Sequence, residues 1–425
     1  MKSIQKIGLS LFLMMGTGAL AQELDANLQL RPRYEYRNGF KELMKDGSLP
    51  TSFVSQRSRL NFNFKQEKLK AKLTFQNIRV WGDVPTTTTS DKNGIALFEA
   101  WAQYDITPKW SARLGRQVIS YDNQRIMGEI DWAQQGQSHD AALISFKQPN
   151  HQLDLGFALN SDAEKLYRDL YTISYKHMQH AWYHTNFDKL GMSLLALNVG
   201  IQYRDAITDE LQVDDMQTFG TYLTYAKNKF DGNLGLYGQT GKAKLVTENT
   251  SVSAYYAGLN ANYAFNTKIK AGLGYEYLSG KDQDDTDSKI KSFWPIFGTN
   301  HAFNGYMDYF YVGNYRNTVG LQDLFAKFTY NNNKWQFNAI PHFFMTAADV
   351  IDPVNPSQKM DSYLGTEMDL TASYTLQKDV MISGGYSQMF GTDTLEILKA
   401  GNKGYDNNWA WVMITINPRI FTTAK

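Results

Sequence analysis

The stretch "NLQLRPRYEYR", residues 27–37, alternates apolar and polar side chains along its whole length. Successive side chains of a β-strand point to opposite faces, so this pattern gives a strand with one apolar and one polar face. The apolar face carries Leu28, Leu30, Tyr34 and Tyr36, and the polar face carries Gln29, Arg31, Arg33, Glu35 and Arg37. The arginines on the polar face are the feature that a fold must accommodate.

The same alternation recurs in distant parts of the chain. It is seen in "QRSRLNFNFK" (56–65), "YAGLNANYAF" (256–265) and "LGTEMDLTASYTL" (364–376). Strands of soluble sandwiches usually have about five or six residues, whereas a tilted transmembrane strand needs about nine to eleven. The length of these runs therefore favours transmembrane strands over a soluble sandwich.

The whole pattern predicts an all-β fold, a transmembrane antiparallel up-and-down β-barrel of about 18 strands. The expected strands are 24–37, 55–65, 68–80, 96–106, 109–120, 137–147, 151–159, 169–186, 190–204, 215–226, 229–241, 251–265, 268–281, 318–330, 334–346, 362–376, 379–390 and 405–417. An even number of strands places both chain ends on the periplasmic side. A barrel of about 16–18 strands leaves an aqueous channel.

The connections support this interpretation because tight joints alternate with long polar loops, as in outer-membrane barrels. The tight joints are expected near residues 66–67, 107–108, 149–150, 188–189, 228, 266–267, 331–333 and 377–378. The longest connection, 281–318, starts with the acidic "KDQDDTD" and continues with an aromatic, Gly-rich segment. So much aromatic content argues against disorder, and we expect this loop to fold against or into the pore.

The chain start has the features of a secretory signal peptide. A basic beginning, an apolar run at 7–15 and Ala19-Leu20-Ala21 predict cleavage after residue 21, which leaves 22–425 as a single barrel domain. With no cysteine, the chain has no disulfide. The net charge of +1 argues against nucleic acid as a partner.

Aromatic residues near the predicted strand ends are expected to anchor the barrel at the two membrane surfaces. This set comprises Trp101, Tyr104, Trp110, Tyr263, Tyr330, Trp335, Trp409 and Trp411.

Arginines on the predicted strands must face the lumen, because a charge facing lipid at the membrane centre costs about 2–4 kcal/mol. The candidates are Arg31, Arg33, Arg57, Arg59 and Arg113, with Arg116 and Arg125 at or beyond the outer end of the fifth strand. Arg116 has the wrong parity relative to Arg113, and Gly115 would permit a β-bulge that turns it inward. Lumen arginines favour anions, and the guanidinium fork matches a carboxylate.

Acidic side chains are also expected in the lumen, where they could pair with the arginines and simply stiffen a wide barrel. They are Glu35, Glu99, Asp131, Asp140, Glu276, Asp323, Glu367 and Asp369. No catalytic residue, metal ligand set or cofactor is predicted. His177 would face opposite to His180 and His184, and "DQDDTD" lacks the Gly and terminal Glu of a calcium loop, which leaves weak calcium binding as an alternative.

Two long segments resemble the signature of the alginate export family of outer-membrane porins. They are "LGRQVISYDNQRIMGEIDWAQQGQSHDA" (114–141) and "WPIFGTNHAFNGYMDYF" (294–310), and "GLQDL" (320–324) and "LGTEMDL" (364–370) extend the resemblance. It implies a monomeric 18-stranded barrel whose arginine-rich constriction favours an anionic uronate polymer. The matching positions are Arg116, Arg125, Asp131 and Asp140, together with His301, Gly305 and Asp308 in the long loop.

The chain departs from the expected pattern in two ways. It continues from Phe421 through Thr-Thr-Ala-Lys, whereas outer-membrane proteins commonly end on an aromatic residue. The isoelectric point near 7.7 also makes the net electric field modest, so the net charge does not predict strong anion selectivity.

The predicted function is passive passage of anionic or polar saccharides across the outer membrane through a lumen lined by the arginines and by Asp131, Asp140, Glu367 and Asp369. The expected partners are outer-membrane lipid and the saccharide, and a periplasmic partner stays open. Two alternatives remain: a general diffusion porin without a specific ligand, and an adhesion or scaffold barrel closed by the 281–318 loop.

Overall fold

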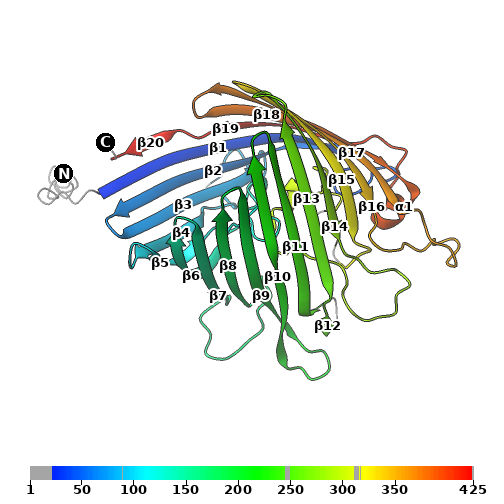
Figure 1. The fold of residues 1–425 in the computed structure, drawn as a ribbon, viewed down its shortest axis with the longest axis horizontal. Helices are drawn as coiled ribbons and strands as arrows, with labels where there is room; N and C mark the ends of the chain where they lie inside the picture. The colour runs from blue at the N-terminus through cyan, green and yellow to red at the C-terminus, as the bar shows by residue number, and fades with distance from the viewer. Residues whose placement is uncertain (1–21, 89, 245–248, 311–314, 316, 424–425) are drawn as a thin grey trace, which may run out of the picture.

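The computed structural model describes residues 22–88, 90–244, 249–310, 315 and 317–423, and it shows a closed antiparallel barrel (Figure 1). Consecutive strands pair with each other, and β1 pairs with both β2 and β19, which closes the wall. The strands are β1 (Gln22–Asn38), β2 (Thr51–Gln66), β3 (Leu69–Val80), β4 (Ala96–Asp105), β5 (Trp110–Gln117), β6 (His139–Gln148), β7 (His151–Leu159), β8 (His177–Phe187), β9 (Leu190–Arg204), β10 (Leu211–Lys227), β11 (Phe230–Lys244), β12 (Asn249–Ser251), β13 (Ala254–Ala264), β14 (Ile269–Leu278), β15 (Leu321–Asn332), β16 (Trp335–Met345), β17 (Tyr363–Gln377), β18 (Val380–Gly391), β19 (Asn407–Ile416) and β20 (Arg419–Thr422).

The barrel has 18 strands, as predicted, once two short segments are counted with their neighbours. β12 pairs only with the end of β11, and β20 continues β19 along β1. Two short helices lie in loops, η1 (Asn300–Ala302) and α1 (Asp393–Lys399). Among the described residues, no helix is both long and apolar enough to cross a membrane.

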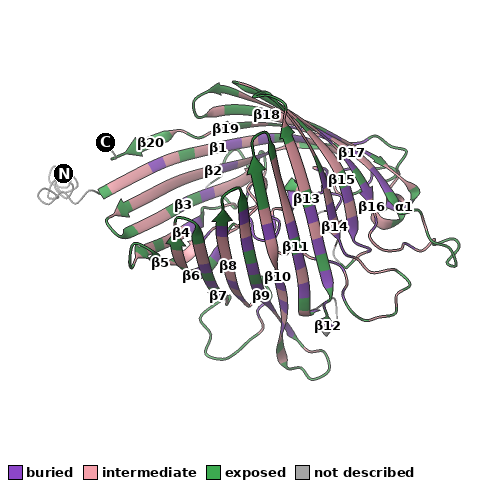
Figure 2. Cartoon of the chain, viewed as in Figure 1, coloured by how far each residue is buried: buried purple, intermediate pink, exposed green. Residues whose placement is uncertain are grey.

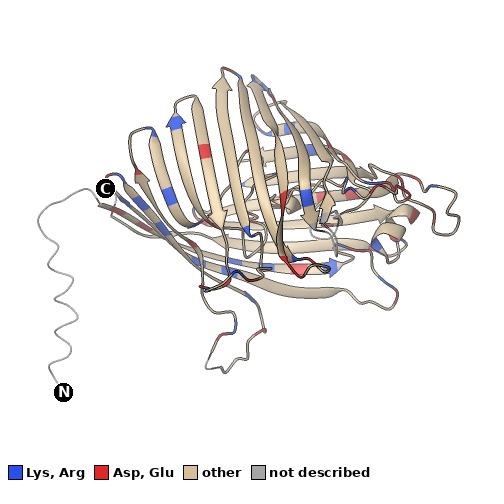
Figure 3. Cartoon of the chain, turned by 90° about the horizontal axis from the view of Figure 1, so that it is seen from below, with Lys and Arg blue, Asp and Glu red and all other residues tan. Residues whose placement is uncertain are grey.

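The side chains of each strand alternate between the outer wall and the interior. On β13, Tyr255, Leu259 and Tyr263 are 57%, 55% and 45% exposed, whereas the intervening Tyr256 is buried. Figure 2 shows the same alternation of buried and exposed positions along the neighbouring strands. Most exposed positions in the middle of the strands are apolar, and charged residues occupy only short bands of the strands and the loops (Figure 3).

Short turns lie at the barrel end where β1 starts and β20 ends (Figure 1). Glu67, Asp188, Asn228, Asn333 and Asp379 have positive φ in these turns. Tight hairpins need such backbone angles to match the twist of the strands. The long loops gather at the opposite end, which we call the long-loop end.

One predicted strand begins too early. Residues 169–176 were expected to open the eighth strand, but β8 starts at His177 and the preceding residues form a loop. The predicted signal peptide, residues 1–21, lies outside the described residues.

Candidate functional site

Two long loops fold into the barrel and meet inside it. Residues 118–138 connect β5 to β6, and residues 279–320 connect β14 to β15. Met127 and Phe297 form a parallel β-bridge between the loops, and the N–H of Thr299 donates to the carbonyl of Gln124 at 2.9 Å. We call residues 118–138 and 290–310 the plug. Because its two halves enter from distant parts of the wall, the plug crosses the interior of the barrel.

The first half of the plug is held by arginines of β1 and β2. Arg31 and Arg57 reach the carboxylate of Asp131 at 3.1 and 2.7 Å, and Arg59 lies 3.8 Å from it. Burial acts to raise the pKa of Asp131, but the charges of Arg57 and Arg31 outweigh it and lower the pKa below its usual value. Asp131 is therefore an ionised group shared by three guanidinium groups.

The same arginines also bind the backbone of the plug. Arg31 donates to the carbonyl of Asp131 at 2.8 Å, and Arg33 donates to the carbonyl of Trp132 at 2.8 Å. The Arg33 guanidinium also lies 4.1 Å from the centre of the Trp132 ring. Arg57, Arg31 and Arg33 are consequently only 0%, 4% and 5% exposed. They face the lumen, as parity predicts, but they anchor the plug instead of facing open water.

Two further arginines line the same wall nearer the short turns. Arg59 packs 3.7 Å over the ring of Phe98, which a register shift between β3 and β4 turns inward. Arg113 lies 4.3 Å over the ring of Trp101 and donates to Gln103 at 2.9 and 3.1 Å. Stacking on aromatic rings holds these guanidinium groups flat against the wall.

Arg125 joins the first half of the plug to the opposite wall. It forms an ion pair with Glu276 of β14 at 2.9 Å and donates to Asn304 at 2.7 Å. Asn304 in turn donates to Glu276 at 3.0 Å and to Asp323 of β15 at 3.2 Å. Arg125 is 2% exposed, so this buried network attaches the plug to the barrel wall and is not open to the channel solution.

The second half of the plug rests on carboxylates of β17. The N–H of Met307 donates to Glu367 at 2.7 Å, and the N–H of Tyr306 donates to Asp369 at 3.0 Å. Gly305 has a φ of +85°, and a Cβ there would lie 2.7 Å from the Glu367 carboxylate. Glycine is required at this position because both the backbone angle and the close approach exclude a side chain.

His301 and Asp308 complete the contact between the two halves. The imidazole shares a hydrogen bond with the Asp308 carboxylate at 2.8 Å. Its ring stacks on Trp132 with 4.5 Å between ring centres. The sequence-predicted loop residues thus meet the sequence-predicted Asp131 segment inside the plug.

The comparison with protein families bears directly on this arrangement. The model of the family described as "Alginate export" matches residues 22–402, which include both halves of the plug. The chain belongs to the alginate export family. No curated protein matches the sequence.

Solved porins share the fold of this alginate export family member. OccK2 (OpdF) of Pseudomonas aeruginosa, solved in complex with glucuronate, is 12% identical with a TM-score of 0.60, over 94% of this chain and 98% of that one. OpdK of the same species is 12% identical with a TM-score of 0.61, over 93% and 98%. OccAB1 of Acinetobacter baumannii is 12% identical with a TM-score of 0.59, over 94% and 97%. At such identity the likeness concerns the fold.

Family and fold together identify an outer-membrane channel for small solutes. They point to a transporter rather than an enzyme. Across the part of the chain that the structure describes, no three His, Asp or Glu side chains are placed to hold a metal ion.

Arg116 and Asp140 lie elsewhere than expected. The β5 ladder pairs Ala100 with Arg116 and Arg116 with Asp140 without a register shift, so no bulge turns Arg116 inward at Gly115. Arg116 shares the outward parity of Leu114, and its partly exposed guanidinium binds Asp140 at 2.7 Å. The pair belongs to the outer wall near the long-loop end, not to the pore lining.

Three of the expected membrane anchors face the lumen instead. Trp101 stacks with Arg113, and the indole of Trp409 is fully buried and donates to Glu35 at 3.1 Å. Trp411 packs edge-on against Trp132 of the plug with 4.8 Å between ring centres. The other five, Tyr104, Trp110, Tyr263, Tyr330 and Trp335, are 39–53% exposed on the outer wall.

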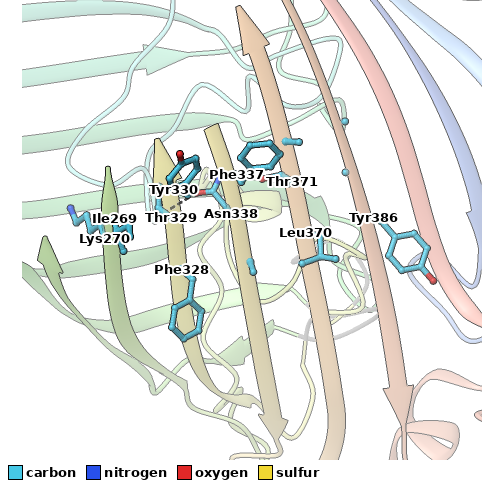
Figure 4. Close-up of a pocket in the computed structure, with 14 residues that line it drawn as sticks. Ile269, Lys270, Phe328, Thr329, Tyr330, Phe337, Asn338, Leu370, Thr371 and Tyr386 are labelled. Atoms are coloured by element: carbon cyan, nitrogen blue, oxygen red, sulfur yellow. Dashed lines mark hydrogen bonds between the residues drawn. The ribbon is translucent and has the colours of Figure 1, made fainter. Parts of the chain in front are cut away.

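Two cavities lie inside the barrel, one on each side of the plug, and a third lies on the outer wall. One of about 290 Å³ opens on the long-loop side of the plug, and one of about 180 Å³ lies on its short-turn side. The largest of the three, about 670 Å³, is a groove along β14–β18 on the outer wall, where Phe328, Phe337, Leu370 and Tyr386 are exposed (Figure 4). Its exposed apolar side chains point away from the lumen, so the groove lies outside the interior of the barrel.

Sequence reasoning missed two cations in the internal cavities. Arg37 lines the cavity on the long-loop side, and its place on the polar face of 27–37 was a usable signal. Lys327 lines the cavity on the short-turn side. It lies two positions after Phe325 on β15, and side chains with this spacing share one face of a strand, which was the usable signal. Neither lies in the most distinctive part of the family signature.

Proposed function

We propose that this channel passes anionic or polar saccharides, uronate-like oligomers or polymers, passively across the outer membrane. The observation that carries the proposal is Arg37 at the cavity on the long-loop side of the plug. Its guanidinium lies 4.2 and 4.8 Å from the ring centres of Phe40 and Phe53, and about a third of the side chain is exposed. A guanidinium can bind a carboxylate, and a flat ring can contact a sugar face.

The charges around this cavity support a preference for anions of modest strength. Arg33, Arg37 and Lys41 face it together with Glu35 and Asp308. Glu35 already accepts hydrogen bonds from both arginines, at 3.0 and 2.8 Å. Positive side chains therefore outnumber negative ones around an incoming carboxylate, but Glu35 neutralises part of the positive charge.

The proposal also covers the oligomeric state, the orientation in the membrane and the absence of a cofactor. The chain would act as a monomer surrounded by outer-membrane lipid, after removal of residues 1–21, with its short turns in the periplasm. It would need no cofactor and catalyse no reaction. The apolar outer wall and the lumen-facing network of charges support this arrangement.

The test is selectivity in a planar bilayer. The reconstituted barrel should show a reversal potential of anion preference in a KCl gradient, and uronate oligomers should block its current more than neutral oligosaccharides. Arg37→Gln combined with Arg113→Gln should weaken both effects. Lys65→Gln is the charge control, since its ion pair with Glu23 lies at the short-turn rim. Cation preference of the unmodified barrel would reject the proposal.

A general diffusion porin is the second candidate, and the burial of Arg31, Arg57 and Arg33 under the plug favours it. Conductance that uronate oligomers do not block would support it. A closed adhesion or scaffold barrel is favoured only by the plug that spans the interior. Absence of conductance that returns on deletion of the 281–318 loop would identify that case.

A further inference from the structure

We propose that the cavity on the short-turn side of the plug is a binding subsite for a single uronate residue, with Lys327 as its anion-binding group. This inference rests on the proposed function and adds a site on the opposite wall from the arginines. The cavity has a volume of about 180 Å³. It is enclosed by β11, β13–β16 and plug residues 302–306.

Lys327 differs from the lumen arginines in being unsatisfied. It shares the inward parity of Asp323 and Phe325 on β15. Within the described ranges of the chain, its ammonium group has no hydrogen bond and no ion pair, whereas the six arginines of β1, β2 and β5 that face the lumen all have partners. A half-buried cation without a partner attracts an anion from the channel solution.

Two side-chain amides lie beside this cation. Asn233 of β11 and Asn260 of β13 are directly opposite each other in the ladder, and both line the cavity. Neither amide has a side-chain hydrogen bond to another described residue. Each amide offers both a donor and an acceptor, which suits the hydroxyl groups of a sugar.

An aromatic surface completes the cavity. Phe325 lies over Gly274, where a Cβ would come within 2.1 Å of its ring, so glycine makes the room for the phenyl group. The ring also lies 5.4 Å from that of His342. The apolar face of a pyranose can pack on such a ring, while the ammonium and the amides bind its polar groups.

The acidic groups around the cavity are already engaged. Glu276 accepts from the hydroxyl of Tyr256 at 2.7 Å and pairs with Arg125. His342 binds Asp323 at 3.0 Å, and Lys270, a neighbouring lumen cation, is paired with Asp231 at 2.5 Å. The unpaired charge in the cavity is thus positive, which favours an anionic over a neutral or cationic sugar.

The experiment measures block of the reconstituted full-length channel by sodium glucuronate, with glucose as the neutral probe. Lys327→Gln should weaken glucuronate block about tenfold or more, because a charged hydrogen bond is lost, and should leave glucose unaffected. Lys327→Arg should largely retain block. Lys270→Gln is the matched control, since it removes an equal charge that is paired, and it should change block by less than about twofold.

Asn260→Ala tests the same site without changing its charge. It should weaken glucuronate block severalfold and leave the reversal potential in a KCl gradient unchanged. The subsite is refuted if the unmodified channel is blocked by glucuronate and both Lys327→Gln and Asn260→Ala are blocked equally well. Failure of glucuronate to block the unmodified channel would also refute the subsite, whereas cation preference of that channel would refute the proposed function.

Discussion

Replacing Asp131 by asparagine should loosen the first half of the plug. The substitution keeps the size of the side chain but removes the charge shared by Arg31, Arg57 and Arg59 at 3.1, 2.7 and 3.8 Å. Breaking a buried ion pair costs about 3–5 kcal/mol and an exposed pair at most about 1 kcal/mol. Arg57 is fully buried and Asp131 is half exposed. We therefore expect a loss of about 2 kcal/mol, which is roughly a thirtyfold shift toward a displaced loop.

Single-channel recording measures this shift as the frequency and duration of openings beyond the resting conductance. Asp140→Asn is the matched control, because it makes the same chemical change in a pair with Arg116 on the outer wall. The temperature at which the barrel unfolds, measured by electrophoretic mobility after heating, should be unchanged in both variants because the strand ladder is intact. If Asp131→Asn gates like the unmodified channel, or if Asp140→Asn opens it equally, the arginines do not hold the plug.

The remaining predictions concern the plug and its surroundings. Gly305→Ala should destabilise the second half of the plug by about 1–3 kcal/mol through its backbone angle and the clash with Glu367, seen as faster proteolysis of residues 290–310; an unchanged cleavage rate would count against it. Cysteines at Met127 and Phe297, in a chain without native cysteine, should form a disulfide that lowers conductance until a reductant is added; a conductance that oxidation leaves unchanged would show that the plug does not move there. Burial lowers the pKa of Lys399 on α1 to about 7 despite the opposing charge of Glu42. Between about pH 7 and 10.5 the unfolded state holds a proton that the folded state has lost, so the stability of this loop rises with pH across that window. Amine labelling of Lys399 should titrate near pH 7, and a midpoint near 10 would contradict the prediction.

The fold was predictable because its information is local. Alternation places each strand, and turn residues such as Asn228 and Asn333 mark the hairpins where positive φ is needed. The error at residues 169–176 has the same local origin. Tyr171 and Tyr175 give this segment a strand-like composition, but both are buried, and the Tyr171 N–H binds Gln202. A tertiary contact overrode local propensity.

The site was only partly predictable, because its decisive contacts join segments far apart in the sequence. The alternation along the strands correctly predicted that Arg31 and Arg57 face the lumen. No local sequence pattern shows that Asp131, a hundred residues from Arg31, folds onto them. The same limit explains the tryptophans. Trp411 was expected near a strand end as a membrane anchor, yet it lies in the middle of β19 and contacts Trp132 of the plug on the inner face. The folding of the plug loops into the barrel determines both the partners of the arginines and the contact of Trp411. This folding depends on packing across the barrel, which a local sequence pattern does not contain.

The two walls that hold the plug carry opposite charges, and this difference has a consequence for an anionic solute. Arg31, Arg57 and Arg59 bind the first half through Asp131, whereas Glu367 and Asp369 bind the second half through backbone N–H groups. We expect a carboxylate that enters the lumen to compete with Asp131 for the guanidinium groups, whereas it has no cation to compete for where backbone N–H groups bind Glu367 and Asp369. Under the proposed function, an anionic solute would therefore weaken the attachment of the first half of the plug and leave the second half in place. This arrangement predicts that one side of the plug responds to the charge of the solute, although the charges of the whole chain nearly balance at +1.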